Sequence, residues 1–84
     1  MSFYVYMLKC VSCKTKKTYV GYSKNLEQRL ILHNSGTGAK FTKGNTWKII
    51  YKKKFRTKVN AMKYEYLLKK NKIKRLEIFK KYKI

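Results

Sequence analysis

The chain contains no proline, no aspartate and only four glycines. Without proline there is no sign of a rigid linker, and 84 residues leave room for one hydrophobic core, so we expect a single domain over residues 1–84. Acidic side chains are scarce: three Glu face 23 Lys and Arg, a formal net charge of +20. Such a chain repels itself and favours a polyanionic partner. We therefore expect it to bind nucleic acid, with an anionic membrane surface as the weaker alternative.

Long apolar runs are also missing. A run such as "YVYML" is far too short to cross a bilayer, and the first residues lack the basic and then apolar pattern of a secretion signal. These features predict a cytoplasmic protein that does not enter a membrane, and nothing in the sequence points to an obligate protein partner.

Cysteine is limited to Cys10 and Cys13, in the segment "CVSC". One C-x-x-C supplies half of a structural zinc site, and the single histidine does not complete it. We expect two reduced thiols in a turn, with a zinc or redox role as the alternatives.

What is present begins with two short strands. Residues 3–9, "FYVYMLK", are aromatic and β-branched with apolar side chains on both faces, which predicts a central strand. Residues 10–16 turn the chain back into a second strand at 17–22, "KTYVGY". Side chains alternate along a strand, so Tyr4, Tyr6 and Leu8 are expected to share one face of the first strand, and Tyr19 and Gly21 one face of the second. Two tyrosines can thus point to the same side.

A helix of about ten residues follows. Asn25 is a good N-cap with Gln28 at the capping-box position, and Gly36 lies just past an end near Asn34. Arg29 and His33 are four residues apart and share one stripe of this helix. In a chain with twenty lysines and three arginines, an arginine here indicates a need for a planar, bidentate cation.

The second half reads as loop, strand, helix and helix. Residues 36–45 are expected to be a solvated connection in which Lys40 and Lys43 can touch phosphates. Residues 46–55 alternate as a third strand, and apolar residues recur at helical spacing over 57–72 and 73–82. The third strand is expected to place Trp47, Ile49 and Tyr51 on one face.

One carboxylate stands out. Glu27 and Glu77 read as surface charges, whereas Glu65 projects from the apolar face of its helix. Two interpretations remain open for Glu65: an ion pair with Lys69 at i+4, or a ligand for a hard divalent cation.

These residues together resemble the GIY-YIG nuclease superfamily. "YVY" at 4–6 and "YVG" at 19–21 are followed by an arginine and a histidine on one helix and by a glutamate on a later helix. The run "HNSGTGAKFT" at 33–42 is similar to that of the small stand-alone members, and the resemblance covers about residues 3–72. It implies an α+β fold in the order β-β-α-β-α-α, with a three-stranded antiparallel sheet flanked by helices and the site on one face of the hairpin.

The resemblance also implies an activity, a metal-dependent phosphodiesterase acting on nucleic acid. One Mg²⁺ or Mn²⁺ would be held by Glu65. Arg29 would grip a nonbridging phosphate oxygen, Tyr6 would be the general base, and His33 and Tyr19 would position the water or the phosphate. By position, the matching catalytic residues are Tyr6, Tyr19, Arg29, His33 and Glu65.

The sequence departs from the family pattern at two positions. Tyr4 stands where the name motif has glycine. Tyr22 stands where the repair endonuclease branch of the family often has a lysine after the second motif. Lys24 is then the candidate for activating the catalytic tyrosine, at a different reach.

Three functions are compatible with the sequence. The first is an endonuclease for DNA in repair or recombination, structure-selective or directed to single strands. The second is a catalytically inactive protein on the same fold that binds DNA or structured RNA. The third is a basic RNA-associated structural protein, such as a ribosome-bound factor, that binds folded RNA without a metal. The complete set of five residues favours the first. Lysines expected to bind the nucleic acid backbone are Lys24, Lys40, Lys43 and Lys69.

Overall fold

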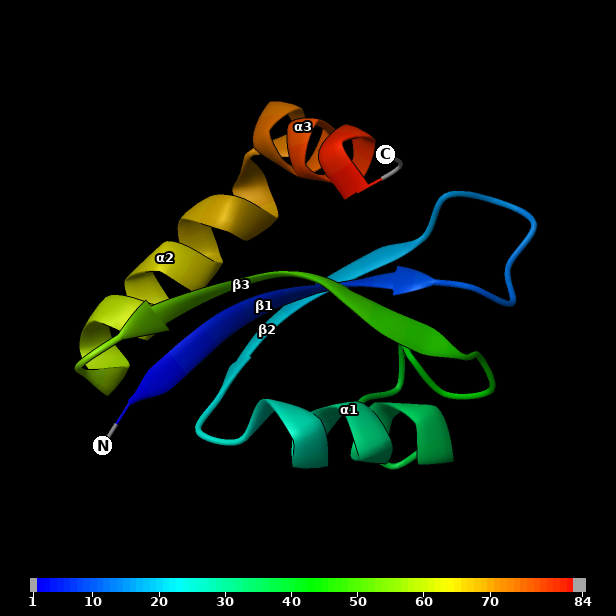
Figure 1. Cartoon of the computed structure of the whole chain (residues 1–84), viewed down its shortest axis with the longest axis horizontal. Coiled ribbons are helices and arrows are strands. Elements are labelled where there is room, and N and C mark those ends of the chain that lie inside the picture. The colour runs from blue at the N-terminus through cyan, green and yellow to red at the C-terminus, as the bar shows by residue number, and fades with distance from the viewer. Residues whose placement is uncertain (1, 83–84) are drawn as a thin grey trace.

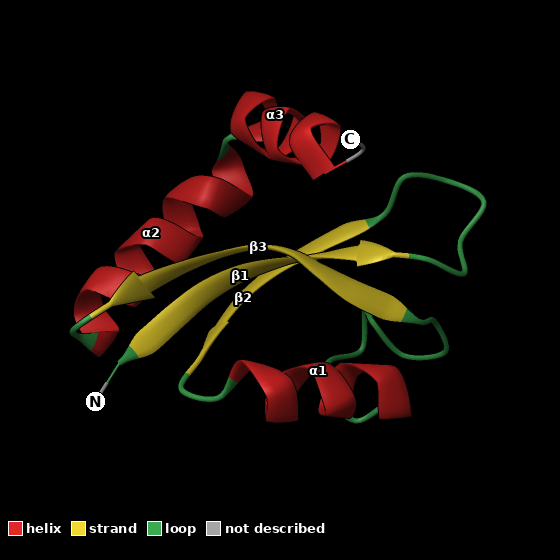
Figure 2. Cartoon of the chain, viewed as in Figure 1, coloured by secondary structure: helices red, strands yellow, loops and turns green. Residues whose placement is uncertain are grey.

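The computed structural model describes residues 2–82 as a small sheet with helices on both faces (Figure 1). Its elements, coloured by type in Figure 2, are β1 (Phe3–Cys10), β2 (Thr18–Ser23), α1 (Leu26–Ser35), β3 (Trp47–Phe55), α2 (Lys58–Lys70) and α3 (Lys72–Tyr82). The expected α+β fold and its order β-β-α-β-α-α are confirmed.

The first strand is central, as its apolar faces predict. The strand order is β2-β1-β3, and β1 is antiparallel to both neighbours. In the β1–β2 register, Tyr6 lies opposite Gly21 and Leu8 lies opposite Tyr19. Because directly opposed residues project to the same side, this register places the two tyrosines of the motifs on one face of the hairpin.

The third strand departs from strict alternation. Leu8 pairs with Ile49 but Met7 pairs with Tyr51, so Ile50 is an extra residue in a β-bulge. The expectation that Tyr51 shares a face with Trp47 and Ile49 is therefore wrong. Beyond the bulge Tyr51 packs on the opposite side of the sheet, and its hydroxyl lies 2.8 Å from that of Tyr64 on α2.

Each face of the sheet has its own apolar core. Val5 and Met7 point toward α2 and α3, while Tyr6 and Leu8 point toward α1 and pack with Trp47. Figure 1 shows α1 below the sheet and α2 and α3 above it. Burial of both faces explains why β1 reads as a continuous apolar run.

The predicted caps fix the helix ends. The Asn25 side chain accepts a hydrogen bond from the Gln28 backbone N–H at 3.1 Å, and Gly36 ends α1 in the left-handed conformation (φ 89°). The helix extends one residue beyond the expected end, to Ser35. A left-handed residue at this position satisfies the last carbonyls most easily when it is glycine. Local sequence therefore sets the span of α1, the helix that carries Arg29 and His33.

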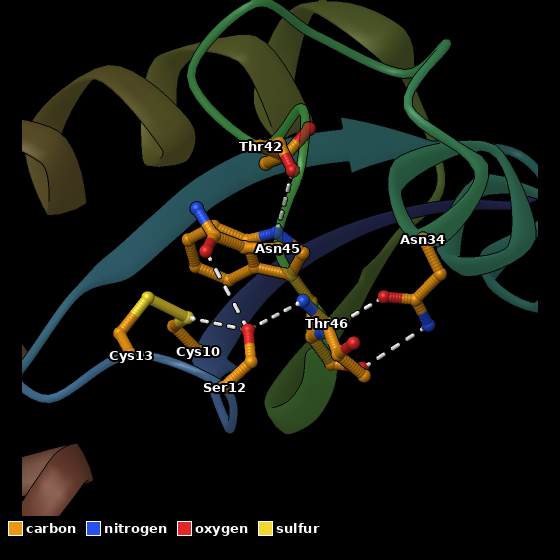
Figure 3. Close-up of a disulfide and its surroundings, with 8 residues drawn as sticks. Cys10, Ser12, Cys13, Asn34, Thr42, Asn45 and Thr46 are labelled. Atoms are coloured by element: carbon orange, nitrogen blue, oxygen red, sulfur yellow. Dashed lines mark hydrogen bonds between the residues drawn. A yellow bond between two sulfur atoms is a disulfide. The ribbon is translucent and has the colours of Figure 1, made fainter.

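The two cysteines differ from expectation. Cys10 and Cys13 form a disulfide, not two free thiols, because the turn after β1 brings their Cα atoms within 5.6 Å. Figure 3 shows Ser12 beside Cys10, on the side away from Cys13, and the Ser12 hydroxyl accepts a hydrogen bond from the Thr46 backbone N–H at 2.9 Å. The zinc alternative lacks ligands, since residues 2–82 contain no group of three or more His, Cys, Asp or Glu suited to a metal.

Within residues 2–82, no helix has both the length and the apolar character needed to cross a bilayer.

Candidate active site

The centre of the site is a hydrogen bond between β1 and α1. The hydroxyl of Tyr6 lies 2.8 Å from Nε2 of His33. Tyr6 reaches this position because β1 directs it toward α1, and because its neighbour across the hairpin is a glycine. A Cβ on Gly21 would lie only 2.6 Å from the Tyr6 hydroxyl oxygen. Gly21 is therefore required for space.

The hydrogen bonds of Thr42 determine which atoms donate between Tyr6, His33 and Thr42. Its hydroxyl donates to the Ala39 carbonyl at 3.0 Å, so it accepts the hydrogen bond from His33 Nδ1 at 2.8 Å. Histidine with its proton on Nδ1 has a lone pair on Nε2. The Tyr6 hydroxyl therefore donates to His33. The phenolic proton of Tyr6 is thus directed at His33 Nε2, which can accept it.

Both ring systems are held in their neutral forms. Burial, and next the positive charge of Arg29, lower the pKa of His33 below its ordinary 6.5. Burial raises the pKa of Tyr6 to about 12, an effect that the Arg29 guanidinium partly offsets. Neutral imidazole and neutral phenol are the forms that the hydrogen-bond directions require.

His33 lies behind Tyr6 and is not among the residues that line the cavity. We expected it to position the water or the phosphate, and its side chain is fully buried, with 0% exposed. Tyr6 lies between His33 and the cavity. His33 can thus act on a substrate only through the Tyr6 hydroxyl, as a positioning and proton-accepting residue.

The cavity in front of Tyr6 joins residues from both faces of the sheet. It has a volume of about 280 Å³. Its lining residues are Tyr6, Tyr19, Gly21, Tyr22, Ser23, Arg29 and Glu65. They come from β1, β2, α1 and α2, although α1 and α2 cover opposite faces. The cavity therefore lies at the sheet edge formed by β2, rather than on one face of the hairpin as expected.

Arg29 lines this cavity, and one of its side-chain nitrogens lacks a hydrogen-bond partner. Its Nε is buried and has no hydrogen-bond partner within residues 2–82. A buried donor without a partner is costly, and a guanidinium is suited to bidentate contact with phosphate. Arg29 is thus arranged to receive an anion.

The position of Glu65 agrees in part with both interpretations left open by the sequence, an ion pair with Lys69 and a ligand for a divalent cation. Its carboxylate oxygen lies 3.8 Å from Nζ of Lys69, an ion pair too long to be a hydrogen bond. The same side chain, 18% exposed, lines the cavity. A carboxylate opposite a guanidinium suits a phosphate only if a cation lies between the two negative groups.

The chemistry of these donors fits a hard divalent cation. Within residues 2–82, Glu65 is the only carboxylate lining the cavity, and phosphate oxygens and water can complete the coordination shell. Mg²⁺ is commonly bound in this way, through one or two carboxylates, substrate phosphates and several waters. The site therefore fits a cation that binds together with its substrate.

Tyr19 connects the cavity to the loop before β3. Its ring centroid lies 4.9 Å from that of His33 and 6.2 Å from that of Phe41. Tyr19 thus packs against the residue that holds Tyr6 while also lining the cavity.

The predicted lysine contacts are separated in the structure. Lys69 is half exposed beside Glu65, and Lys40 and Lys43 are exposed in the loop after α1. The ammonium of Lys24 lies over the ring of Phe3 at 5.5 Å. Phe3 packs against the core on the α2 side, so Lys24 does not take the place of the missing lysine beside Tyr6. The Tyr6 hydroxyl is instead hydrogen-bonded to His33.

Sequence reasoning missed Thr42 and Gly38. Thr42 is fully buried and orients His33, and a Cβ on Gly38 would lie 2.5 Å from His33 Nδ1. Both belong to the loop that was expected to be a solvated connection. The available signal was the run at 33–42, which carries them together with His33.

Comparison with known proteins shows the family to which the chain is similar. The family model of the GIY-YIG catalytic domain matches residues 2–83. A UPF0213 protein of Oceanobacillus iheyensis is 43% identical over 82 residues, covering 96% of this chain and 86% of the relative. The UPF0213 protein YazA of Bacillus subtilis is 40% identical over 70 residues, covering 82% of this chain and 71% of YazA.

A solved structure supports the same assignment. The NMR structure of a UPF0213 protein from Bacillus halodurans has a TM-score of 0.56 and 33% identity, covering 95% of this chain and 84% of that one. The chain belongs to the GIY-YIG family of nuclease domains, and within it to the small UPF0213 proteins. The resemblance seen in the sequence motifs is confirmed.

The contact between Gly21 and Tyr6 gives a first prediction. Gly21→Ala is expected to lower the free energy of unfolding by about 1–3 kcal/mol, since the new methyl overlaps the fixed Tyr6 ring. Urea denaturation measures this. In the Tyr6→Phe background the closest overlap is gone, so the cost should be smaller. Equal costs in both backgrounds would show that the overlap is not the cause.

Proposed function

We propose that this protein is a metal-dependent endonuclease that hydrolyses phosphodiester bonds in DNA. The observation that carries the proposal is the unpartnered Nε of Arg29, buried beside a cavity shared with Tyr6 and Glu65. A guanidinium, a hydroxyl bonded to a neutral histidine and a lone carboxylate are the groups that phosphodiester hydrolysis needs. Membership of a nuclease family and the +20 charge support a nucleic acid substrate.

Arg29 would bind the scissile phosphate. Its forked donors can hold a nonbridging oxygen and stabilise the charge that grows there in the transition state. Glu65 would hold a single Mg²⁺ or Mn²⁺, which when bound acts as a Lewis acid on the leaving-group side.

Tyr6 and His33 would together remove the proton from the attacking water. A neutral phenol is a poor base, but the Tyr6 oxygen can accept the water proton as its own proton passes to His33 Nε2. The resulting imidazolium keeps its Nδ1–H bond to Thr42. This route needs no free phenolate, which burial disfavours.

Tyr19 would position the phosphate, because it lines the cavity while its ring packs against His33. Lys40, Lys43 and Lys69 would bind the DNA backbone without reading its sequence. Lys24, exposed beside Phe3, would add to this backbone contact.

A cleavage assay tests the proposal. End-labelled single-stranded, duplex and branched DNA and a single-stranded RNA are incubated at low salt with Mg²⁺ or Mn²⁺. We expect DNA products that disappear with EDTA and decrease as salt is raised. Binding that is tight and salt-sensitive, with no cleavage of any substrate, would contradict the nuclease and favour the inactive binding protein.

A further inference from the structure

A second cavity adjoins the candidate active site. It has a volume of about 290 Å³ and is lined by Thr18, Tyr19, Val20, Phe41, Lys69 and Arg75. Tyr19 lines both cavities, so a ligand in the second is a neighbour of a phosphate held by Arg29 in the first. Of its lining residues, the proposed function uses Tyr19 and Lys69 and gives Phe41 and Arg75 no role.

The aromatic wall of this cavity is Phe41, in the loop between α1 and β3. Although it is a large apolar residue, 54% of it is exposed. Its ring is stacked on Tyr19, with centroids 6.2 Å apart and an angle of 23° between the planes. On another side its centroid lies 6.0 Å from that of Trp47.

The loop holds Phe41 in a fixed position. The next residue, Thr42, is buried, contacts His33 through its hydroxyl and accepts the Trp47 indole N–H at its carbonyl, 2.9 Å away. An exposed ring on an anchored loop loses little conformational freedom when a ligand stacks on it. Phe41 is thus a preorganised flat surface.

Two cations border the same cavity. Lys69 is half exposed, and the Arg75 guanidinium is fixed by donating from Nη1 to the carbonyls of Leu68, at 2.8 Å, and Lys69. An aromatic surface bordered by cations is the arrangement with which proteins bind single-stranded nucleic acid, by stacking a base and neutralising the backbone.

We propose that Phe41 is a stacking platform for an unpaired nucleobase next to the scissile phosphate. The inference rests on the proposed function for the position of that phosphate. A base within a duplex is already stacked and paired, so this platform favours substrates that are single-stranded at the cleavage site.

Binding without catalysis tests this inference. The affinities of a labelled oligothymidylate and of an abasic oligonucleotide of equal length are measured by fluorescence anisotropy in EDTA. We expect the protein to bind the base-containing strand about 5-fold or more tightly. Phe41→Ala should abolish this preference, and Phe41→Trp should retain it.

Two further variants separate stacking from folding. Phe41→Leu keeps an apolar side chain without a ring, so it should lose the preference while its thermal unfolding midpoint stays close to that of the natural protein. Val59→Ala, which truncates a similarly exposed apolar residue on α2, should change nothing. An unchanged preference in Phe41→Ala or Phe41→Leu, or no preference in the natural protein, would overturn the platform.

The two proposals fail in different ways. Absence of cleavage together with a preference that depends on Phe41 removes the nuclease and leaves the platform. Metal-dependent cleavage without that preference removes the platform and leaves the nuclease.

Discussion

Glu65→Gln is expected to lower the rate of DNA cleavage by about 100-fold or more. The substitution keeps the size of the side chain and removes the carboxylate that, among the described residues, is alone in lining the candidate active-site cavity. Without that charge, residue 65 could no longer hold the proposed divalent cation, which would stabilise the leaving oxygen. Initial rates with saturating Mg²⁺ measure the effect.

Two comparisons make the Glu65 result specific. Glu77→Gln, at an exposed position on α3, makes the same chemical change and should leave the rate unaltered. In EDTA, Glu65→Gln should bind DNA at least as tightly as the natural protein, because the carboxylate repels phosphate when no cation is present. Cleavage at the natural rate by Glu65→Gln would refute the role of Glu65.

Tyr6→Phe is the second large effect that we expect, again a loss of about 100-fold or more in cleavage rate. Phenylalanine preserves the ring but removes the oxygen that lies between the cavity and His33. Without this oxygen, the buried histidine has no route to the attacking water. Single-turnover rates on saturating DNA separate this loss from any change in binding. Tyr66→Phe, at an exposed position on α2, is the matched control.

The pH dependence of cleavage reports on His33. Only the neutral imidazole can accept the Tyr6 proton, so the rate should fall at acid pH as His33 becomes protonated. Because burial and Arg29 lower the pKa of His33, this fall should lie below pH 6.5. The residual cleavage rate of Tyr6→Phe should show no such fall at acid pH. A profile with the same acid limb in both proteins would exclude a relay through His33.

Alkaline unfolding checks the burial of Tyr6 independently of activity. The pKa of Tyr6 is raised to about 12 when folded, whereas an unfolded tyrosine ionises near pH 10. The unfolded chain then loses the proton first, so Tyr6 lowers the free energy of unfolding as pH rises from 10 to 12. Relative to Tyr6→Phe, the natural protein should lose roughly 2 kcal/mol over this range. Comparing the two proteins cancels the titration of the many lysines.

Several features of the fold could be predicted because they depend on local sequence. Asn25 and Gly36 define α1 through the capping bonds that their own side chain and backbone make. Alternation places Tyr6 and Leu8 on one face of β1 and Tyr19 and Gly21 on one face of β2, and the register of the hairpin then brings the two tyrosines to the same side. The β3 prediction failed at Ile50 because a bulge depends on how two strands fit together, which periodicity within one strand does not record.

The candidate site was predictable in its residue types more than in its arrangement. The motifs identified Tyr6, Tyr19, Arg29 and Glu65, which the structure brings to one cavity. They did not show that His33 lies behind Tyr6. That depends on burial and on Thr42, a residue whose side chain gives no catalytic signal in the sequence.

The sequence by itself determined the order of the elements, the strongly basic charge and the family, since these follow from composition, spacing and local propensity. Tertiary structure alone decided that Glu65, on the α2 side of the sheet, lines the same cavity as Arg29, on the α1 side. This cavity lies at the edge formed by β2. It also placed Phe41 beside Tyr19. The physical reason is that contacts between distant residues depend on strand register and on the packing of two separate cores, and neither is encoded in any single segment.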